Sequence, residues 1–513
     1  MKKMDMFSWV TSLGRIHGAS FMLLIGLGYW VQGFRSFPWI TVNFYLKDSL
    51  SVNPGTLQIV QNTVNLPMVA KPVYGIVSDA VYIRGAHRIP YLVIGGCLQA
   101  ISWGLISFMP EHGASIVLVT VLLALSNLGA SLAEVVNDAL VAECAKKKKT
   151  TGELQSFAWF STAAGGVLGS LIATLALSRV EYRNIFGIFG TIVLFHIGKS
   201  IAFNEGALGL WSPHLLNGTA GTQDQFSSEL GLNTEIWASI KSHAHESQGM
   251  YTLERSENGY KPAVLKVENS DHLAVDGFSE KVHHRGGMKQ QLVDLVWLLQ
   301  QREIMYPLSW FVASYAMIPT LALTVFFYQT EHLKVDPAVI GIARLIGQLG
   351  LMGGSVLYSR YLKNIPMRKL LTYVQVLLFT CMLFDIILVK RLNILIGIPD
   401  SVMVLGMSAY VDAINQFKVL PFAILLGQLC PAGKEGALLA AFMSMQCLAT
   451  IVSGYLGVSL TSALHISAHD FSKLPLGIVI QAFAALIPLF WISFIPAGHK
   501  ISSSHQTEEC KEF

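Results

Sequence analysis

The sequence has few charged residues for its length. Its 36 Lys and Arg and 32 Asp and Glu make up 13% of 513 residues, about half the share found in soluble globular proteins. Hydrophobic residues make up 52%, and the mean hydropathy is +0.50. Because a water-facing surface cannot hold so many apolar side chains, the composition predicts an integral membrane protein.

Signs of metal, redox or catalytic chemistry are also lacking. The six cysteines form no CxxC pair or Cys/His cluster, which argues against a disulfide framework and against a zinc site. There is no Walker loop, no HExxH motif and no Ser/His/Asp set at a common membrane depth, so we expect no enzyme activity and no cofactor. A net charge of +4 with scattered basic residues argues against a nucleic-acid partner.

Long apolar runs take the place of these features. A helix needs about 20 mostly apolar residues to cross the hydrocarbon core. The sequence predicts twelve such spans, of which the sixth is the weakest because it contains His196 and Lys199. The predicted spans cover residues 16–46, 57–77, 89–109, 114–142, 156–177, 184–203, 304–329, 337–362, 367–389, 401–429, 433–463 and 474–495.

The distribution of charge predicts the topology. With the N-terminus inside, inner segments hold 24 Lys and Arg and outer segments hold 7, the bias expected of cytoplasmic loops. We therefore expect an all-α protein with two six-helix bundles; a resemblance given below, to the major facilitator superfamily, implies the major facilitator fold. Its parts are a cytosolic N-terminus (1–15), a first bundle (16–203), a cytosolic linker (204–302), a second bundle (303–497) and a cytosolic tail (498–513).

The linker differs in composition from both bundles. It holds 8 basic and 12 acidic residues, and most of it lacks periodicity, so we expect it to be largely solvated and without regular structure. Residues 291–300 are the exception. Their apolar side chains recur at helical spacing and predict a helix along the membrane surface.

Several ionisable residues fall within the predicted spans. Each costs at least about 2.5–3.5 kcal/mol in the hydrocarbon region and so needs a partner, a watery cavity or a function. Helical spacing places Tyr29 and Gln32 on one helix face with Arg35. It also places Gln416 on one helix face with Asp412. Either these groups bind a polar cargo or they form structural ion pairs. The ionisable residues are Arg35, Lys71, Glu134, Asp138, Asp412 and Lys418.

A possible gate lies between the second and third spans. Gly75 and Asp79 are followed by Arg84 and Arg88, an order that resembles the gating motif of the major facilitator superfamily. Small residues let helices approach closely. An aspartate at an inner helix end can face the N-terminus of another helix, here the eleventh span near Gly433. The arginines can pair with Asp138 or Glu143 at the inner end of the fourth span.

Longer strings resemble one particular family. Residues 66–79 (LPMVAKPVYGIVSD), 88–92 (RIPYL), 428–436 (QLCPAGKEG) and 29–33 (YWVQG) are similar to the signature of the folate–biopterin transporter family, particularly its plant branch. The resemblance implies transport of folates or pterins by alternating access, with the first, fourth, seventh and tenth spans lining a central cavity.

The chemistry of such cargo assigns roles to the charged residues. A folate carries two carboxylates and a flat hydrogen-bonding pterin, so buried cations suit one end while aromatic and amide groups suit the other. We therefore expect Tyr29, Gln32, Arg35, Lys71, Asp412, Gln416 and Lys418 to bind cargo. Candidates for coupling to a proton are Glu134, Asp138 and Asp412.

Other functions remain open from the sequence. The chain could carry a different organic anion, or serve as a membrane sensor or scaffold that moves no cargo. We expect a monomer in a lipid bilayer, and the sequence leaves open whether the membrane is the plastid envelope, the plasma membrane or the vacuole.

Overall fold

The computed structural model describes most of the apolar part of the chain and a short part of the linker. The described residues are 8–83, 86, 88–110, 113–148, 151–177, 179–203, 251–256, 259–264, 288–362, 365–406, 414, 417–419, 421–422, 425, 435–468 and 470–495. Residues 1–210 and 285–513 form one compact unit, and residues 211–284 form a second.

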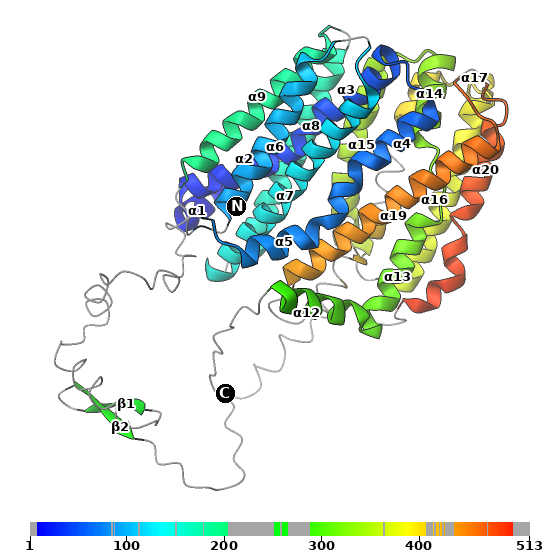
Figure 1. The fold of residues 1–513 in the computed structure, drawn as a ribbon. Coiled ribbons are helices and arrows are strands. Elements are labelled where there is room, and N and C mark those ends of the chain that lie inside the picture. The colour runs from blue at the N-terminus through cyan, green and yellow to red at the C-terminus, as the bar shows by residue number, and fades with distance from the viewer. Residues whose placement is uncertain are drawn as a thin grey trace, which may run out of the picture. The chain divides into compact units, whose positions relative to one another are not determined.

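The helices of the first unit fall into two halves along the chain (Figure 1). We call residues 8–203 the first half and residues 288–495 the second half. Helices of the first half are α1 (Ser8–His17), α2 (Ala19–Phe34), α3 (Ser36–Phe44), η1 (Tyr45–Ser49), α4 (Pro54–Asn65), η2 (Leu66–Ala70), α5 (Lys71–Ala80), α6 (Ile89–Phe108), α7 (Ile116–Lys148), α8 (Thr151–Leu177) and α9 (Tyr182–Ile201).

The second half has a matching series of helices. They are α12 (Met288–Gln300), α13 (Arg302–Ala316), α14 (Ala322–Phe327), η5 (Tyr328–His332), α15 (Pro337–Leu357), η6 (Tyr358–Leu362), α16 (Met367–Val389), α17 (Leu392–Leu395), α19 (Glu435–Ala463), α20 (Leu474–Ala484) and η7 (Ile487–Phe494).

Each of the twelve predicted spans contains described helical residues. Among the described residues, seven helices are each long and apolar enough to cross a membrane, or eight if α1 and the helices after it count as one bent span. The sixth predicted span is one of the seven, as α9. The tenth span is only partly described, so the full count of twelve stays a prediction.

Several spans are broken where the sequence analysis expected one continuous helix. The first begins earlier than predicted and bends by 120° between α1 and the next helix, at Gly18, whose φ of 86° favours glycine. Prolines account for other breaks, because proline has no N–H and its ring clashes with the carbonyl four residues before it. Pro38 follows the α2–α3 junction, Pro67 lies in η2, and Pro319 lies between α13 and α14.

The linker contains more regular structure than expected. Strands β1 (Tyr251–Ser256) and β2 (Gly259–Val264) pair antiparallel, with Ser256 opposite Gly259. In the described part of the chain the fold is therefore helical apart from this small hairpin in the linker. The helix predicted over 291–300 is confirmed as α12.

The two halves meet through a few helices. In the first unit α4, η2 and α5 contact α19, and α8 contacts α15. One buried apolar cluster holds side chains from both halves, among them Phe44, Phe186, Phe326 and Ile340. The other clusters each belong to a single half.

Candidate functional site

Arg35, Lys71 and Glu134 form one ion cluster inside the first half. Arg35 Nη1 lies 3.1 Å from Glu134 Oε1, and Lys71 Nζ lies 2.6 Å from Glu134 Oε2. The three side chains are between 11% and 20% exposed. Because they come from α2, α5 and α7, the cluster joins three predicted spans through one carboxylate.

Breaks in the helices position the two cations. Arg35 occupies the junction between α2 and α3. Lys71 is the first residue of α5, directly before Pro72. A cation at a helix N-terminus opposes the helix dipole, so the pairing with Glu134 offsets an unfavourable position for Lys71.

A second acid and two asparagines extend the cluster. Tyr29 Oη donates a 2.5 Å hydrogen bond to Asp138 Oδ1. Arg35 Nη2 donates to Asn127 Oδ1 at 2.6 Å, and the amide nitrogen of Asn127 donates to Val64 O at 2.6 Å and to Asn65 Oδ1 at 3.1 Å. We call Arg35, Lys71, Glu134 and Asp138 the charged cluster. Its two cations and two carboxylates cancel when all four are ionised.

Lys418 forms a different kind of site in the second half. Its side chain is buried, Nζ donates to Ser314 O at 2.8 Å, and Nζ lies 3.7 Å from the centre of the Tyr315 ring. This is a cation–π contact. Among the described residues, no carboxylate lies within ion-pair distance of Lys418.

Arg88 forms a brace at the end of the first half where α5, α6 and α7 meet. Its guanidinium pairs with Asp79, contacts Glu143 Oε1 at 2.5 Å and donates to Ser78 Oγ at 2.7 Å. Burial alone would lower the pKa of Arg88, but Glu143 and Asp79 raise it above the ordinary value for arginine. Ser78, Asp79 and Glu143 all lie in the first half, so the brace holds three of its helices together.

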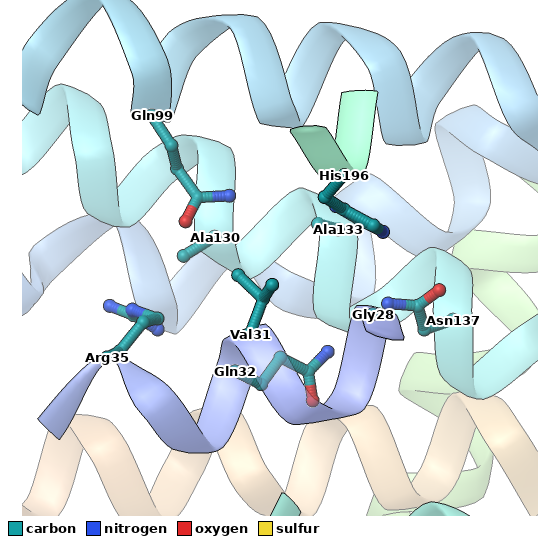
Figure 2. A pocket seen from close by; sticks show the side chains of 9 residues that line it. All are labelled: Gly28, Val31, Gln32, Arg35, Gln99, Ala130, Ala133, Asn137 and His196. Carbon is teal, nitrogen blue, oxygen red and sulfur yellow. The ribbon is translucent and has the colours of Figure 1, made fainter. Parts of the chain in front are cut away.

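A small cavity lies beside the charged cluster. It has room for about 10 Å³, roughly what one water molecule needs. Figure 2 shows that α2, α6, α7 and α9 supply its lining, which includes Gln32, Arg35, Gln99, Asn137 and His196.

The structure brings together some of the predicted residues. Tyr29, Arg35, Lys71, Glu134 and Asp138 meet as described, which realises the ion pairs that the sequence left as an alternative to cargo binding. Gln32 lines the cavity, and Lys418 lies apart in the second half. The predicted Arg84, Asp412 and Gln416 lie outside the described residues.

Most residues of the predicted gate are among the described residues. Arg88 pairs with Asp79 and Glu143 as expected, whereas Asp138 bonds to Tyr29 instead. A Cβ on Gly75 would lie 3.4 Å from Val135, so the packing there does not demand glycine. α5 does contact α19, but residues 426–434 before α19 lie outside the described part, and contact with Asp79 stays a prediction.

Sequence reasoning missed several polar residues. Asn127, Asn137 and Gln99 are fully or almost fully buried, and His196 was noted only as weakening a span. The signal was available, because amides and imidazoles inside long apolar runs are costly unless they are paired.

The chain matches known proteins along nearly its whole length. A model of the BT1 family matches residues 32–512. "Probable folate-biopterin transporter 7" of Arabidopsis thaliana is 38% identical over 475 residues, which cover 92% of each chain. "Folate-biopterin transporter" of a Synechocystis strain is 25% identical over 473 residues, or 92% of this chain and 80% of the relative.

Solved structures show the same fold. "Crystal structure of D-xylose-proton symporter" matches with a TM-score of 0.59 and 15% identity, and covers 94% of this chain and 98% of the other. A peptide transporter in complex with sulfate matches with a TM-score of 0.58 and 14% identity, over 92% and 93% of the two chains. The protein is thus a multi-pass membrane protein with the major facilitator fold, and it belongs to the BT1 family.

Proposed function

We propose that the protein is a secondary transporter that moves folates or pterins across a membrane by alternating access. The observation that carries this proposal is the charged cluster with Tyr29 and Asn127, which places ionised groups inside an otherwise apolar bundle. The names of the relatives supply the cargo class, and the carboxylates of the charged cluster make proton coupling part of the proposal.

Different site residues suit different chemical groups of the cargo. Lys418 and Tyr315 together offer a cation and an aromatic face, which suit a carboxylate and a flat ring respectively. Arg35 is held by Glu134 and Asn127, so a cargo carboxylate would compete with Glu134 for it. We therefore assign carboxylate recognition to Lys418 and Arg35, and recognition of the polar pterin edge to the acids and amides around them.

Uptake by the purified protein in lipid vesicles tests this function. We expect saturable uptake of radiolabelled folate or biopterin, reduced by unlabelled folates and pterins. Competition by unrelated organic anions alone would indicate a carrier for another anion. Correctly inserted protein with no saturable uptake of any of these would contradict the proposal and favour a sensor or scaffold.

Comparing two cargoes tests the assigned cations. For Arg35→Gln and Lys418→Gln we expect folate affinity to fall about tenfold or more, since a charge-assisted hydrogen bond contributes about 1.5–3 kcal/mol. The affinity for biopterin, which has no carboxylate, should fall less. Lys199→Gln is the matched control, because Lys199 is an exposed cation over the Phe195 ring of α9. Equal losses for both cargoes would point to a purely structural role.

A further inference from the structure

The cavity beside the charged cluster is lined by polar atoms that have no partner. Among the described residues, no partner is found for either amide atom of Asn137, for Gln99 Oε1 or for His196 Nε2. These three side chains are at most 4% exposed. Each unpaired buried polar group destabilises the folded state by about 1–3 kcal/mol. Without a partner such as bound water, these atoms would therefore destabilise the first half.

Two further unpaired atoms come from the residues nearest the charged cluster. Gln32 Nε2 and Arg35 Nε are buried, have no partner in the described part of the chain and belong to residues that line the same cavity (Figure 2). The lining thus offers amide and guanidinium donors together with carbonyl acceptors. A buried water typically makes about three hydrogen bonds to such groups, so the cavity has both the size and the chemistry of a water site.

The packing around the cavity is tight. A Cβ on Gly28 would lie 2.7 Å from Asn137 Nδ2, so α2 reaches the Asn137 amide only because residue 28 has no side chain. Gly96 similarly admits Ile197 of α9 against α6, where a Cβ would lie 2.5 Å from the isoleucine side chain. These close approaches leave no room for a side chain at either glycine.

His196 is the titratable group of this cavity that the proposed cargo site does not use. It shares the lining with Arg35 at the α2–α3 junction and with the uncharged Gln99 of α6 and Asn137 of α7. On α7, Asp138 directly follows Asn137 and Glu134 precedes it by three positions. Helix α3, which also packs on α9, has no ionisable residue. On α9 itself, Lys199 lies over the Phe195 ring.

We propose that this cavity is a hydrated proton site, in which His196 takes up a proton through bound water and thereby favours an anionic cargo beside Arg35. The proton arrives from solvent through the water and binds the Nε2 lone pair of the neutral imidazole, giving an imidazolium; it leaves by the same route. The charged cluster alone is neutral, so a proton on His196 gives the region one net positive charge.

Proton and cargo then assist each other. The positive charge of Arg35 opposes protonation of His196, and a bound carboxylate relieves this repulsion. Because such coupling is reciprocal, protonation must strengthen binding of the anion by the same factor. The coupling role extends the proposed function and rests on it, whereas protonation of His196 can be measured without cargo.

Nitrogen NMR on the purified full-length protein, labelled with ¹⁵N-histidine, tests the proton site. The signal of His196 is the one absent from His196→Gln. We expect it to change between pH 8 and pH 5 in the free protein, and to show a larger protonated fraction at pH 6 when folate is bound. Gln99→Leu keeps His196 but removes a water partner, and it should reduce that fraction. A His196 signal that is constant from pH 8 to pH 5, with and without folate, would overturn the proposal.

Uptake separates this inference from the proposed function. In the wild type we expect folate affinity to be at least about threefold higher at pH 5.5 than at pH 7.5, with a smaller ratio for biopterin. His196→Gln should lose this pH dependence of folate affinity while keeping uptake at pH 7.5. His332→Gln, which changes an exposed histidine, should keep the pH dependence.

Two outcomes would contradict the inference. If His196→Gln keeps the pH dependence and Asp138→Asn abolishes it, the coupling proton is on Asp138 and our assignment is wrong. If His196 titrates but the wild type neither binds nor moves folate or biopterin, the proposed function and the coupling to cargo both fail.

Discussion

The two ends of the helical unit differ in how the halves are held together. At the end that contains η1 and η5, which we call the Lys47 end, Lys47 Nζ lies 2.5 Å from Glu331 Oε1 of the other half. The rings of Phe44 and Phe326 also meet there edge to face, 5.3 Å apart. At the opposite end, the Arg88 end, α5 also contacts α12 and α19 of the second half, but Asp79 and Glu143, which pair with Arg88, both lie in the first half, and no apolar cluster of described residues there crosses between the halves.

This difference assigns separate tasks to the two ends. Alternating access in folds of this kind is largely a rocking of one bundle against the other. An ion pair within one half stays intact during rocking, while contacts that cross the halves must break. We infer that the structure is closed at the Lys47 end, and we propose that the motif around Arg88 acts as a brace that keeps α5, α6 and α7 moving as one body.

The largest effect is expected from breaking the brace. Arg88→Ala leaves Asp79 and Glu143 without their shared cation. Removing one partner of a fully buried pair costs about 3–5 kcal/mol, and the cost here should be lower because the two acids are 34% and 22% exposed. We expect a lower thermal unfolding temperature together with reduced uptake per molecule at the membrane.

A charge-conserving variant sharpens this result. Arg88→Lys keeps the positive charge but lacks the planar guanidinium that spans both acids. Its unfolding temperature and its uptake should therefore lie between those of the wild type and those of Arg88→Ala. Unfolding temperature and uptake equal to the wild type in Arg88→Ala would show that the brace has no mechanical role.

A smaller effect is expected from disturbing the close approach of the halves at the Lys47 end. A Cβ on Gly341 of α15 would lie 2.2 Å from Thr174 Oγ1 and 2.9 Å from Thr174 Cα on α8, and the backbone there cannot simply rotate away. Gly341→Ala should cost about 1–3 kcal/mol in the closed state. We therefore expect less cross-linking between cysteines placed at positions 47 and 331.

The same helix offers a matched control. A Cβ on Gly353 would meet nothing within 4 Å, so Gly353→Ala should leave the cross-linking unchanged. Equal cross-linking in both variants would mean that the α8–α15 contact does not limit closure.

The sequence predicted residue types better than partners. Arg35, Lys71, Glu134 and Asp138 stood out because ionisable groups inside apolar runs are costly. Which cation meets which acid depends on how helices far apart in sequence turn towards one another. Arg35 and Glu134 are separated by 99 positions in sequence, so no local pattern predicts their pairing. The order of Asp79 and Arg88 did carry one, since both lie at the ends of consecutive spans.

The sequence also contains signals for the helix breaks and for the buried amides. The prolines at 38, 67 and 319 explain broken helices by a rule that needs no structure. The buried amides of Gln99 and Asn137 lie in runs that had already been identified as spans. The linker hairpin is harder to foresee, because a two-stranded unit is stabilised mainly by cross-strand pairing and has little periodicity of its own.

The smallest effect is expected from the ion pair that crosses between the halves. Lys47 is 9% exposed but Glu331 is 48% exposed, and such partly solvated pairs contribute about 0.2–1 kcal/mol. Glu331→Gln leaves Lys47 with Asp48, whose Oδ1 lies 2.7 Å away, so the protein should stay folded. The closed population should fall by at most about fivefold relative to the open one. Accessibility of a cysteine at position 44 to a water-soluble reagent measures this change, and Lys473→Gln, an exposed charge at the same end, is the control. Because exposed pairs are screened by salt, the difference between Glu331→Gln and wild type should shrink at about 0.5 M salt; a difference that persists unchanged would mean that the halves are joined there by packing and not by charge.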